Sequence, residues 1–554
     1  MTSDELSHIG KAAIVELTSK HEVYNEKLWA KTSGSMTGRG IAHSPEGTWN
    51  VDKDPAEGHS NWLPAELASL LSKTEAFCDF ASLSPPSLDG KFEALIIEAL
   101  QTIAQRSIDT DKKIIVRFLF GNIIAFPVNC DAIMKKFTAA LPKESKLSIW
   151  VGAWRKGMCW NHAKIVAVDG KEVYTGGHNL WDDVYLQNDP IHDTSIHLKG
   201  EVAVQAHLFM NTQWSFIRDR QSTWTGWVVD KFYNDGWILP AVTRVTISEW
   251  PEKSSSKYAP VFEKDTVRAS RLDSVDDASD DDDVVPILAL GRYGNIVDNA
   301  RSSDDAFIAM FQAAQKSIKF ILQDLGPVNK TVLGKKIVYK TWPKAYFRTF
   351  SKAMFERDVD IEIVLSNPES GEARGNYSNG WSCEEVAAEI IKTMKEQFPE
   401  ASDDLLKKKT KDNLRVCFLR NKIGNRWDSN NKVGLHSKFF IVDDVCTYVG
   451  SQNLYKFDLA EWGVAIDSEK KTFEIKSQLW DPMWNASYLD GSDVNEDRVI
   501  EILGIDRDPN GTISDKELSE LELDLDYKHM KASDHYDDEN VAVGTIARFL
   551  SCYF

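Results

Sequence analysis

The sequence predicts an α/β protein with two similar α/β-sandwich halves, related by a pseudo-two-fold axis, and a small helical C-terminal extension. The first observation behind this fold class is a repeat. Residues 161–181 (NHAKIVAVDGKEVYTGGHNLW) and 435–455 (LHSKFFIVDDVCTYVGSQNLY) each place Lys two, Asp seven, Gly 14 and Asn 17 residues after a histidine. The second observation is that helical and buried-strand patterns alternate before each copy. A match in register indicates a duplicated unit, and the alternation favours a sandwich in each half.

The elements of the two halves follow the same order. Apolar spacing and short apolar runs in the first half predict a helix over 92–103 and strands over 114–120, 147–151, 165–168 and 173–175. The second half repeats this with a helix over 346–356 and strands over 361–365, 416–419, 439–442 and 447–449. Because side chains two apart on a strand share a face, we expect the His and Lys of each motif on one face. The Asn of each motif falls on the loop after the returning strand.

Composition changes along the chain predict four segments. The two similar halves span residues 1–250 and 286–490, and a C-terminal extension spans 491–554. Between the halves, residues 251–285 are Ser-rich and then acidic, without periodicity, which predicts a surface linker or insert. The run 273–283 within it is interpreted as a solvated charge run, with a calcium-attracting or partner-binding patch as the alternative.

The net charge of −19 over 554 residues is unevenly distributed. Residues 273–283 hold seven acids and no base, and residues 490–540 hold 17 acids and five bases, so the rest of the chain is neutral. A neutral body argues against a protein that binds nucleic acid by neutralising phosphates, although a local basic groove stays open. No nucleic-acid partner is therefore expected.

The hydrophobic content limits the class of protein and the cellular compartment that the sequence predicts. A hydrophobic content of 42% excludes a disordered chain, and no apolar run is long enough for a transmembrane segment. The first 20 residues carry charges throughout and contain no apolar core typical of a secretion signal. The sequence therefore predicts a cytoplasmic or peripheral membrane location, and secretion stays open if the numbering is that of a mature chain.

The repeated residues suit phosphoryl chemistry. Two lysines supply charge for anionic oxygens, and two asparagine amides add neutral donors. One imidazole can attack phosphorus while the other protonates the leaving oxygen, and no metal or other cofactor is needed at this centre. The candidate residues are His162, His436, Lys164, Lys438, Asn179 and Asn453.

These motifs resemble the paired HKD motifs of the phospholipase D superfamily. The closer resemblance is to the bacterial secreted type, which has a GG form in the first motif, here Gly176-Gly177, and a GS form in the second, here Gly450-Ser451. The similarity continues through Trp160-Asn161 and the stretch LWDPMW at 479–484, and it spans roughly residues 20–490. The chain departs from the type by continuing beyond residue 490.

The resemblance implies a role for each residue of the motifs. His162 would be the nucleophile that forms a phosphohistidine, and His436 the general acid and then base. Two lysines and two asparagines would hold the phosphate, and four residues would be structural: Asp169, Asp443, Gly177 and Ser451. Asp193 and Glu461 fall where the family places a carboxylate against the second nitrogen of each histidine, although an Asp is expected at 461. Transfer of the phosphatidyl group to an alcohol is also implied.

The C-terminal extension contains a candidate calcium loop. Residues 506–517 fit the pattern D-x-D-x-N-G-x-I-S-x-x-E of an EF-hand. Helices over 494–503 and 515–523 would flank it, and an acidic helix–turn–helix without an ion is the alternative. No second such loop follows. The predicted Ca²⁺ ligands are Asp506, Asp508, Asn510, Thr512, Ser514 and Glu517.

The sequence therefore predicts a monomeric phospholipase D that acts on phospholipid at a membrane or micelle surface. It would release phosphatidic acid and a free alcohol. A phosphodiesterase of the same superfamily acting on nucleic acid, and a non-enzymatic calcium-regulated binding protein, are the two alternatives.

Overall fold

The computed structural model describes most of the chain between residues 6 and 503. The described ranges are 6–45, 62–123, 127–156, 159–186, 191–222, 260–272, 283–293, 300–327, 329–332, 335–338, 344–366, 380–420, 434–455, 459–488 and 494–503.

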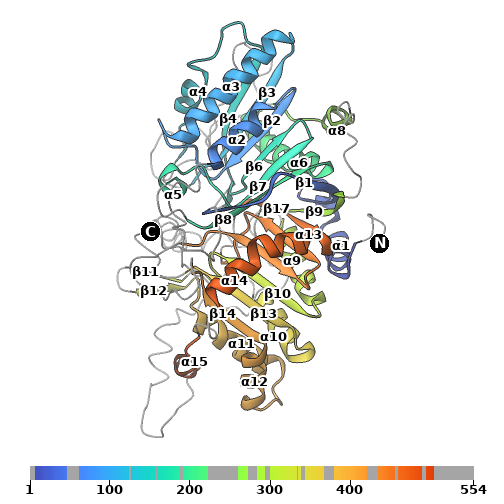
Figure 1. Cartoon of the computed structure of the whole chain (residues 1–554), viewed down its shortest axis with the longest axis vertical. Coiled ribbons are helices and arrows are strands. Elements are labelled where there is room, and N and C mark those ends of the chain that lie inside the picture. Colours follow the sequence, from blue (N-terminus) through green and yellow to red (C-terminus); the bar gives the residue numbers. More distant parts are fainter. Residues whose placement is uncertain are drawn as a thin grey trace.

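One sheet of 15 strands runs through both halves of the molecule (Figure 1). The first half contributes β8 (Asp193–Lys199), β7 (Glu172–Gly176), β6 (Ile165–Val168), β2 (Phe77–Ser82), β3 (Ile114–Gly121), β4 (Leu147–Lys156) and β5 (Cys159–Trp160), in this spatial order. The second contributes β9 (Val285–Arg292), β17 (Glu461–Asp467), β16 (Cys446–Gly450), β15 (Lys438–Val442), β10 (Ser317–Leu322), β13 (Asp360–Leu365) and β14 (Leu414–Phe418). A separate hairpin joins β11 (Asn329–Val332) and β12 (Lys335–Val338).

The two halves have the same topology. In the first, β2 pairs antiparallel with β6 and parallel with β3, and β3 pairs parallel with β4. In the second, β10 pairs antiparallel with β15 and parallel with β13, and β13 pairs parallel with β14. β1 (Trp29–Ser44) joins the halves, because its first part pairs with β9 and its later part with β8. This confirms the prediction of two similar α/β halves.

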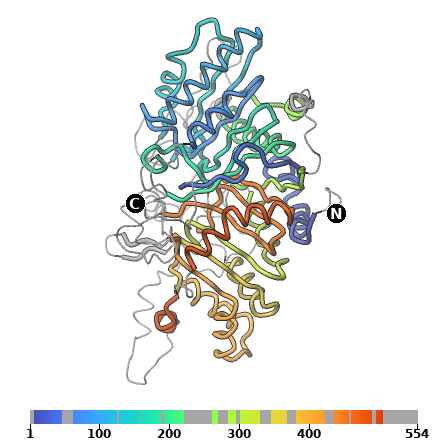
Figure 2. Tube along the Cα trace, in the orientation of Figure 1, coloured from blue at the N-terminus to red at the C-terminus, as the bar shows by residue number. Residues whose placement is uncertain are grey.

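Helices cover the sheet and make its strands buried on both faces. In the first half these are α2 (Trp62–Ser72), α3 (Lys91–Asp109), α4 (Cys130–Thr138), α5 (Asp182–Tyr185) and α6 (Glu201–Ser222). In the second they are α9 (Ser302–Ala313), α10 (Ala345–Arg357), α11 (Cys383–Gln397), α12 (Asp403–Asn413), α13 (Glu469–Ile475), α14 (Asp481–Ser487) and α15 (Glu496–Ile502), with a π-helical turn, η3, at Lys476–Trp480. The Cα trace shows the halves as the blue-green upper part and the yellow-red lower part of the molecule (Figure 2).

The central hydrophobic core is shared by both halves. It packs Trp214 of α6 with Trp462 of β17 and Trp480 of η3, all nearly inaccessible to solvent. Each half has a further core under its outer helices, around Phe118 in the first and Phe320 in the second. Burial of large aromatic side chains from both halves in one cluster stabilises the junction that the candidate site occupies.

The strands and helices predicted within the described ranges are confirmed, with ends that differ by no more than six residues, whereas the helix predicted over 515–523 lies outside those ranges. For example, β6 has the predicted bounds, and the helix predicted over 92–103 is the longer α3. The prediction that residues 251–285 form an irregular linker is wrong for part of that range. Residues 264–272 form helix α8 (Lys264–Leu272), and Phe262 and Val267 are buried against Phe77 and Leu208.

The segment predicted as the first half, residues 1–250, also differs from the structure at its N-terminal end. Helix α1 (His8–His21), followed by the 3₁₀ turn η1 (Glu22–Tyr24), lies with the second half rather than the first (Figure 1). Its Ile9, Ala13 and Leu17 belong to the core of the second half, and His21 bonds Asp305 of α9 at 2.8 Å. The amphipathic pattern of this helix does not specify which sheet it covers.

None of the helices within the described ranges combines the length and apolar character that crossing a membrane requires.

Candidate active site

The structure brings the two motif histidines into carboxylate pairs that cross between the halves. His162 Nδ1 lies 2.8 Å from Oε2 of Glu461, and His436 Nδ1 lies 2.6 Å from Oδ2 of Asp193. Each histidine therefore uses a carboxylate from the other half. An ionised carboxylate only accepts, so Nδ1 carries the proton in each pair and Nε2 of a neutral ring keeps its lone pair.

Backbone hydrogen bonds also join each motif histidine to the half of the molecule that supplies its carboxylate. The N–H of His162 donates to the carbonyl oxygen of Ala460 at 2.8 Å, next to Glu461. The N–H of His436 donates to the carbonyl oxygen of His192 at 2.7 Å, next to Asp193. Each catalytic candidate is thus held beside its carboxylate by main chain from both halves.

The histidines lie just before their strands rather than on them. His162 and Lys164 precede β6, and only Lys438 begins a strand, β15. The expectation that each His and Lys share one face of a strand is therefore wrong in detail. Lys164 Nζ donates to the carbonyl oxygen of His162 at 2.7 Å, and Lys438 Nζ donates to that of His436.

The two lysines are buried cations at one site. Burial lowers the pKa of Lys438 to about 8. Burial, together with the charge of Lys438, holds the pKa of Lys164 well below its usual range. Because like charges destabilise each other in a buried site, an anion bound between the lysines would relieve this repulsion.

Burial and the two lysines also keep the imidazoles neutral. Burial and the charges of Lys164 and Lys438 lower the pKa of His162 to about 3, although Glu461 opposes them. Burial lowers the pKa of His436 to about 4 in the same way, opposed by Asp193. An anionic ligand would favour protonation of one ring, because its charge opposes that of the lysines.

The asparagines lie on the loops that follow β7 and β16, as predicted. Asn179 is fully buried, and neither its side-chain oxygen nor its nitrogen has a hydrogen-bond partner among the described residues. The buried side-chain oxygen of Asn453 likewise has no hydrogen-bond partner among the described residues. A buried amide without a protein partner is costly, so both groups are suited to contact a polar ligand.

Asp169 and Asp443 hold the edges of the motif strands. The carboxylate of Asp169 accepts N–H groups of residues 75–77 at 2.8–2.9 Å, where β2 begins. Asp443 accepts those of residues 315–317 at 2.7–3.1 Å, where β10 begins. Both have a φ of 53°, a conformation that Asp tolerates. They lie in equivalent places and anchor the neighbouring strand.

Gly177 and Ser451 occupy equivalent positions with different contacts. A Cβ at Gly177 would lie 1.9 Å from Oδ1 of Asp193, so the first motif requires glycine there. In the second motif the hydroxyl of Ser451 donates to Oε2 of Glu461 at 2.7 Å. The longer Glu461 is therefore accompanied by a serine that hydrogen-bonds its carboxylate.

Three site residues were not predicted from the sequence. Tyr185 donates its hydroxyl to Oδ2 of Asp193 at 2.7 Å, and the ring of Trp181 has its centroid 5.9 Å from that of His436. Arg292 lies at the end of β9, with Nη2 3.7 Å from Oε1 of Glu461. Trp181 stands next to the first motif in the sequence, whereas Arg292 has no counterpart in the repeat that would have marked it.

The chain is similar to a curated phospholipase D of Streptomyces antibioticus, with 24% identity over 435 residues and 74% of each chain covered. This similarity supports a place in the phospholipase D superfamily. Among solved structures, a phosphatidylserine synthase of Haemophilus influenzae aligns with 13% identity and a TM-score of 0.46, covering 90% of this chain and 96% of that one. Nuc of Salmonella typhimurium, a phospholipase D family member, aligns over 36% of this chain and 96% of its own, with 16% identity and a TM-score of 0.22. No family model matches the chain.

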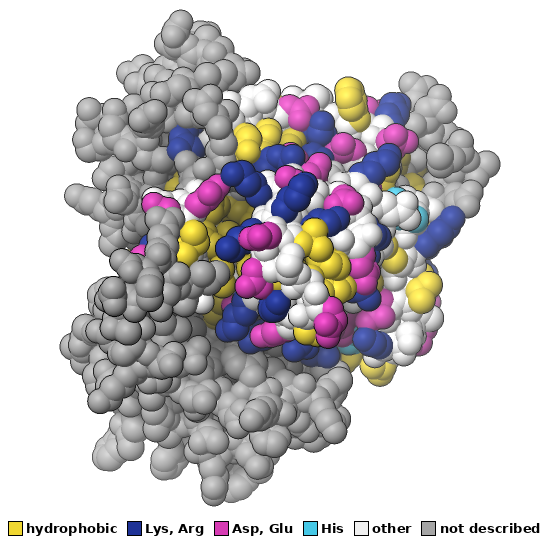
Figure 3. Space-filling view, turned by 90° about the horizontal axis from the view of Figure 1, so that it is seen from below, with side chains coloured by type: hydrophobic (Ala, Val, Ile, Leu, Met, Phe, Trp, Pro, Cys, Tyr) yellow, Lys and Arg dark blue, Asp and Glu magenta, His cyan; other side chains and the backbone are white. Residues whose placement is uncertain are grey.

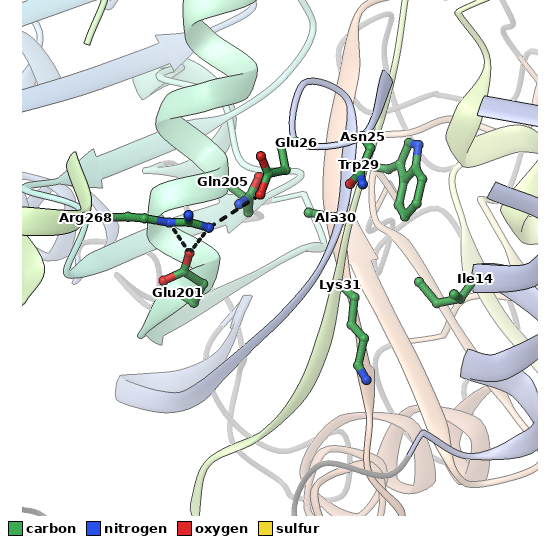
Figure 4. A pocket seen from close by; sticks show the side chains of 9 residues that line it. All are labelled: Ile14, Asn25, Glu26, Trp29, Ala30, Lys31, Glu201, Gln205 and Arg268. Atoms are coloured by element: carbon green, nitrogen blue, oxygen red, sulfur yellow. Dashed lines mark hydrogen bonds and ion pairs between the residues drawn. The ribbon is translucent and has the colours of Figure 1, made fainter. Parts of the chain in front are cut away.

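A cavity of about 560 Å³ lies away from the residues of this candidate site (Figure 4). It opens between α1, the start of β1, α6 and α8, and its lining includes Trp29, Glu26, Glu201 and Arg268. Arg268 already pairs with Glu201 at 3.1 Å and with Glu26 at 3.5 Å. Three of the charged side chains drawn there, Arg268, Glu201 and Glu26, are thus engaged with one another.

The predicted calcium loop, residues 506–517, lies outside the described residues. Within the described ranges, no group of three His, Cys, Asp or Glu side chains is arranged to hold a metal ion.

Proposed function

We propose that the chain is a phospholipase D that hydrolyses glycerophospholipids to phosphatidic acid and a free alcohol. The observation that carries this proposal is the crossed arrangement of two buried histidine–carboxylate pairs around two buried lysines. The similarity to a curated phospholipase D supports the same reaction class.

In the first step, Nε2 of His162 attacks phosphorus and the bond from phosphorus to the headgroup oxygen breaks. His436, protonated on Nε2, gives its proton to that oxygen, and the headgroup leaves as an alcohol. Glu461 stabilises the positive charge that develops on the His162 ring. The product on the chain is a phosphatidyl group bound to Nε2 of His162.

In the second step, a water molecule takes the place of the alcohol. His436, now neutral, accepts a proton from the water as its oxygen attacks phosphorus. The phosphorus–nitrogen bond breaks, phosphatidic acid leaves, and both histidines return to their starting states. A second alcohol in place of water would give a new phospholipid, so we include phosphatidyl transfer in the proposal.

The phosphate itself would be held by the lysines and asparagines. Lys164 and Lys438 provide charge for the two non-bridging oxygens, and the buried amides of Asn179 and Asn453 provide donors. All four groups are present before substrate binds, which lowers the reorganisation that the reaction requires.

The described charge on one face of the molecule argues against nucleic acid as the substrate. On the face drawn in Figure 3, the described Lys and Arg side chains are interspersed with Asp and Glu rather than gathered in a band. A band of basic residues is what phosphate-backbone binding needs. We further propose that residues 506–517 bind Ca²⁺ outside the catalytic centre.

The proposal is tested with a panel of phospholipids and product analysis, with ethanol added to detect transfer. Release of headgroup with formation of phosphatidic acid, and of phosphatidylethanol when ethanol is present, supports it. Cleavage of single- or double-stranded DNA with no turnover of any phospholipid would replace it by the nuclease alternative. No turnover of any phosphodiester would favour the non-enzymatic alternative.

A further inference from the structure

Arg292 and Ser44 are equivalent positions with opposite electrostatic character. The register pairs Glu461 of β17 with Arg292 of β9, and Asp193 of β8 with Ser44 of β1. Since β9 has the place in the second half that β1 has in the first, the strand beside each carboxylate carries a cation in one half and a neutral hydroxyl in the other. The motifs are alike, but their surroundings are not.

The guanidinium of Arg292 is fully buried and its direction is fixed. Nη1 donates to Oδ1 of Asp304 at 2.6 Å, and Nη2 lies 3.7 Å from Oε1 of Glu461. Nη2 also donates to the carbonyl oxygen of Asn453 at 3.4 Å. Tyr346 and Gln452 donate to the same Oδ1 of Asp304, at 3.0 and 2.9 Å, and hold it behind the arginine. The ion pair therefore presents its positive end to Glu461.

Among the described residues, no Lys or Arg forms a hydrogen bond or ion pair with the carboxylate of the first half, Asp193. Asp193 accepts from the hydroxyl of Tyr185 at 2.7 Å, and its backbone N–H donates to Ser44 at 3.2 Å. Ser44 also contacts Nε2 of His178, whose pKa burial lowers to about 4, so that this ring is neutral. A motif lysine offsets part of the charge of each carboxylate, Lys438 for Asp193 and Lys164 for Glu461, but Arg292 offsets a further part of the charge of Glu461 alone.

We propose that Arg292 is a positioning residue that makes His162 the weaker base of the two motif histidines, and so places their shared proton on His436. This inference rests on the proposed function, because it assigns the nucleophile and the acid that the reaction needs. With a phosphodiester bound, one proton is shared between two coupled rings, and it resides on the ring of higher proton affinity. A nucleophile of lower basicity is also the better leaving group when the phosphorus–nitrogen bond breaks.

Other charges act on the two rings more evenly. Both histidines face Lys164 and Lys438. Glu461 further faces Ser451 and Tyr448, and Asp193 faces Tyr185 and His178. Among these described neighbours, Arg292 with Asp304 is the charged pair that acts on one side alone.

The test compares R292K with the double variant R292Q/D304N, which removes both charges of the ion pair so that neither Arg292 nor Asp304 is left without the other. The measurement is the pH dependence of kcat with the chromogenic diester bis(p-nitrophenyl) phosphate. We expect the acid limb of R292Q/D304N to move up by about one pH unit, because His162 gains proton affinity when a nearby cation is removed. In R292K, which keeps the positive charge, the acid limb of the pH profile should stay where it is in the wild type.

The matched control is R117Q/D79N. Arg117 is the other fully buried arginine in a close carboxylate pair within the described ranges, with Asp79 at 2.7 Å. It contacts Asn211 and Pro260 rather than either motif histidine. This control reports the effect of losing a buried ion pair as such, and its acid limb should stay in place.

The inference would be overturned if the acid limb of the pH profile did not move in folded R292Q/D304N, or if it moved equally far in R292K. If the double variant does not fold, D304N alone decides, because an unneutralised Arg292 should move the limb to lower pH and no movement contradicts the inference. If the wild-type chain turns over no phosphodiester, the proposed function fails instead. The proton affinity of His162 can then still be compared in wild type and variants by NMR titration of its imidazole.

Discussion

At Glu461 the second half has a glutamate where the first half has Asp193, and the surrounding residues account for the difference. The longer side chain reaches His162 Nδ1 at 2.8 Å while its carboxylate also accepts from Ser451 at 2.7 Å. In the first half, a side chain at Gly177 would collide with Asp193, so no serine can serve there. The GG and GS forms of the two motifs thus match the length of the carboxylate that each motif faces.

This match gives a prediction for Glu461 itself. Glu461→Gln keeps the shape but cannot hold an Nδ1–H tautomer through a charged acceptor, so we expect kcat to fall by roughly 10²–10⁴-fold. Glu461→Asp keeps the charge but is one methylene short, and we expect a smaller loss. Steady-state rates on a short-chain phospholipid measure both. Equal activity of Glu461→Gln and wild type would show that the carboxylate does not act on His162.

At the scale of elements, each motif Asp ties one strand to its neighbour. Asp169 accepts three backbone N–H groups at the start of β2, and removing a charged acceptor leaves them without a partner. We expect Asp169→Ala to lower the free energy of unfolding by roughly 3–5 kcal/mol, and Asp169→Asn, which keeps one oxygen, by less. Denaturant unfolding measures both. Asp443→Ala is the matched variant in the second half, and a negligible loss in both would refute the anchoring role.

A second element contact depends on pH. His197 of β8 bonds Glu172 of β7 at 2.9 Å and Glu66 of α2 at 3.2 Å. Burial opposes protonation of His197, but these hydrogen bonds and charges outweigh it and raise its pKa. A group with a raised folded pKa contributes stability that is fully present below its unfolded pKa, about 6.5, and is lost as pH rises through the folded pKa.

We therefore expect His197→Gln to lower the melting temperature more at pH 5.5 than at pH 9. At pH 5.5 both glutamates are still ionised. The hydrogen bonds and charges of His197 and Lys73 hold the pKa of Glu172 at about 2 despite its burial, and the hydrogen bond of His197 lowers the pKa of Glu66. Thermal melts of wild type and variant at the two pH values make the comparison. A difference that does not change with pH would contradict the charged triad.

At the scale of the whole molecule, the proposed Ca²⁺ loop should affect stability rather than chemistry. The proposed catalytic centre has its own cations in Lys164 and Lys438. Binding of Ca²⁺ to the folded form alone stabilises it by about 2.7 kcal/mol at a hundredfold excess over Kd. We expect a chelator to lower the melting temperature while substantial activity on a soluble phosphodiester remains, and Glu517→Gln to abolish the calcium-dependent stabilisation. Loss of that activity with chelator, but not with Glu517→Gln, would place the metal at the catalytic centre.

The sequence predicted the parts of the molecule that are repeated. The motif strands, the histidines, lysines and asparagines, and the α/β class all follow from two copies in register. The resemblance also named Asp193 and Glu461 as the carboxylates beside the histidines, but not which carboxylate faces which histidine. His162 and Glu461 are 299 residues apart, and only the folded junction shows that the pairs cross between the halves. Arg292 occurs once, so no repeat marked it, and flanking Ser-rich and acidic residues obscured the helix at 264–272.

The central claim is that two histidines from opposite halves perform one covalent cycle with His162 as the nucleophile. Acid quench of the wild-type chain during turnover of a phospholipid labelled in its phosphate, followed by peptide mapping, tests this most directly. We predict label on His162, no label in His162→Asn, and a loss of several orders of magnitude in rate in both His162→Asn and His436→Asn. Label on His436, or more than a few per cent of wild-type activity in either variant, would contradict it.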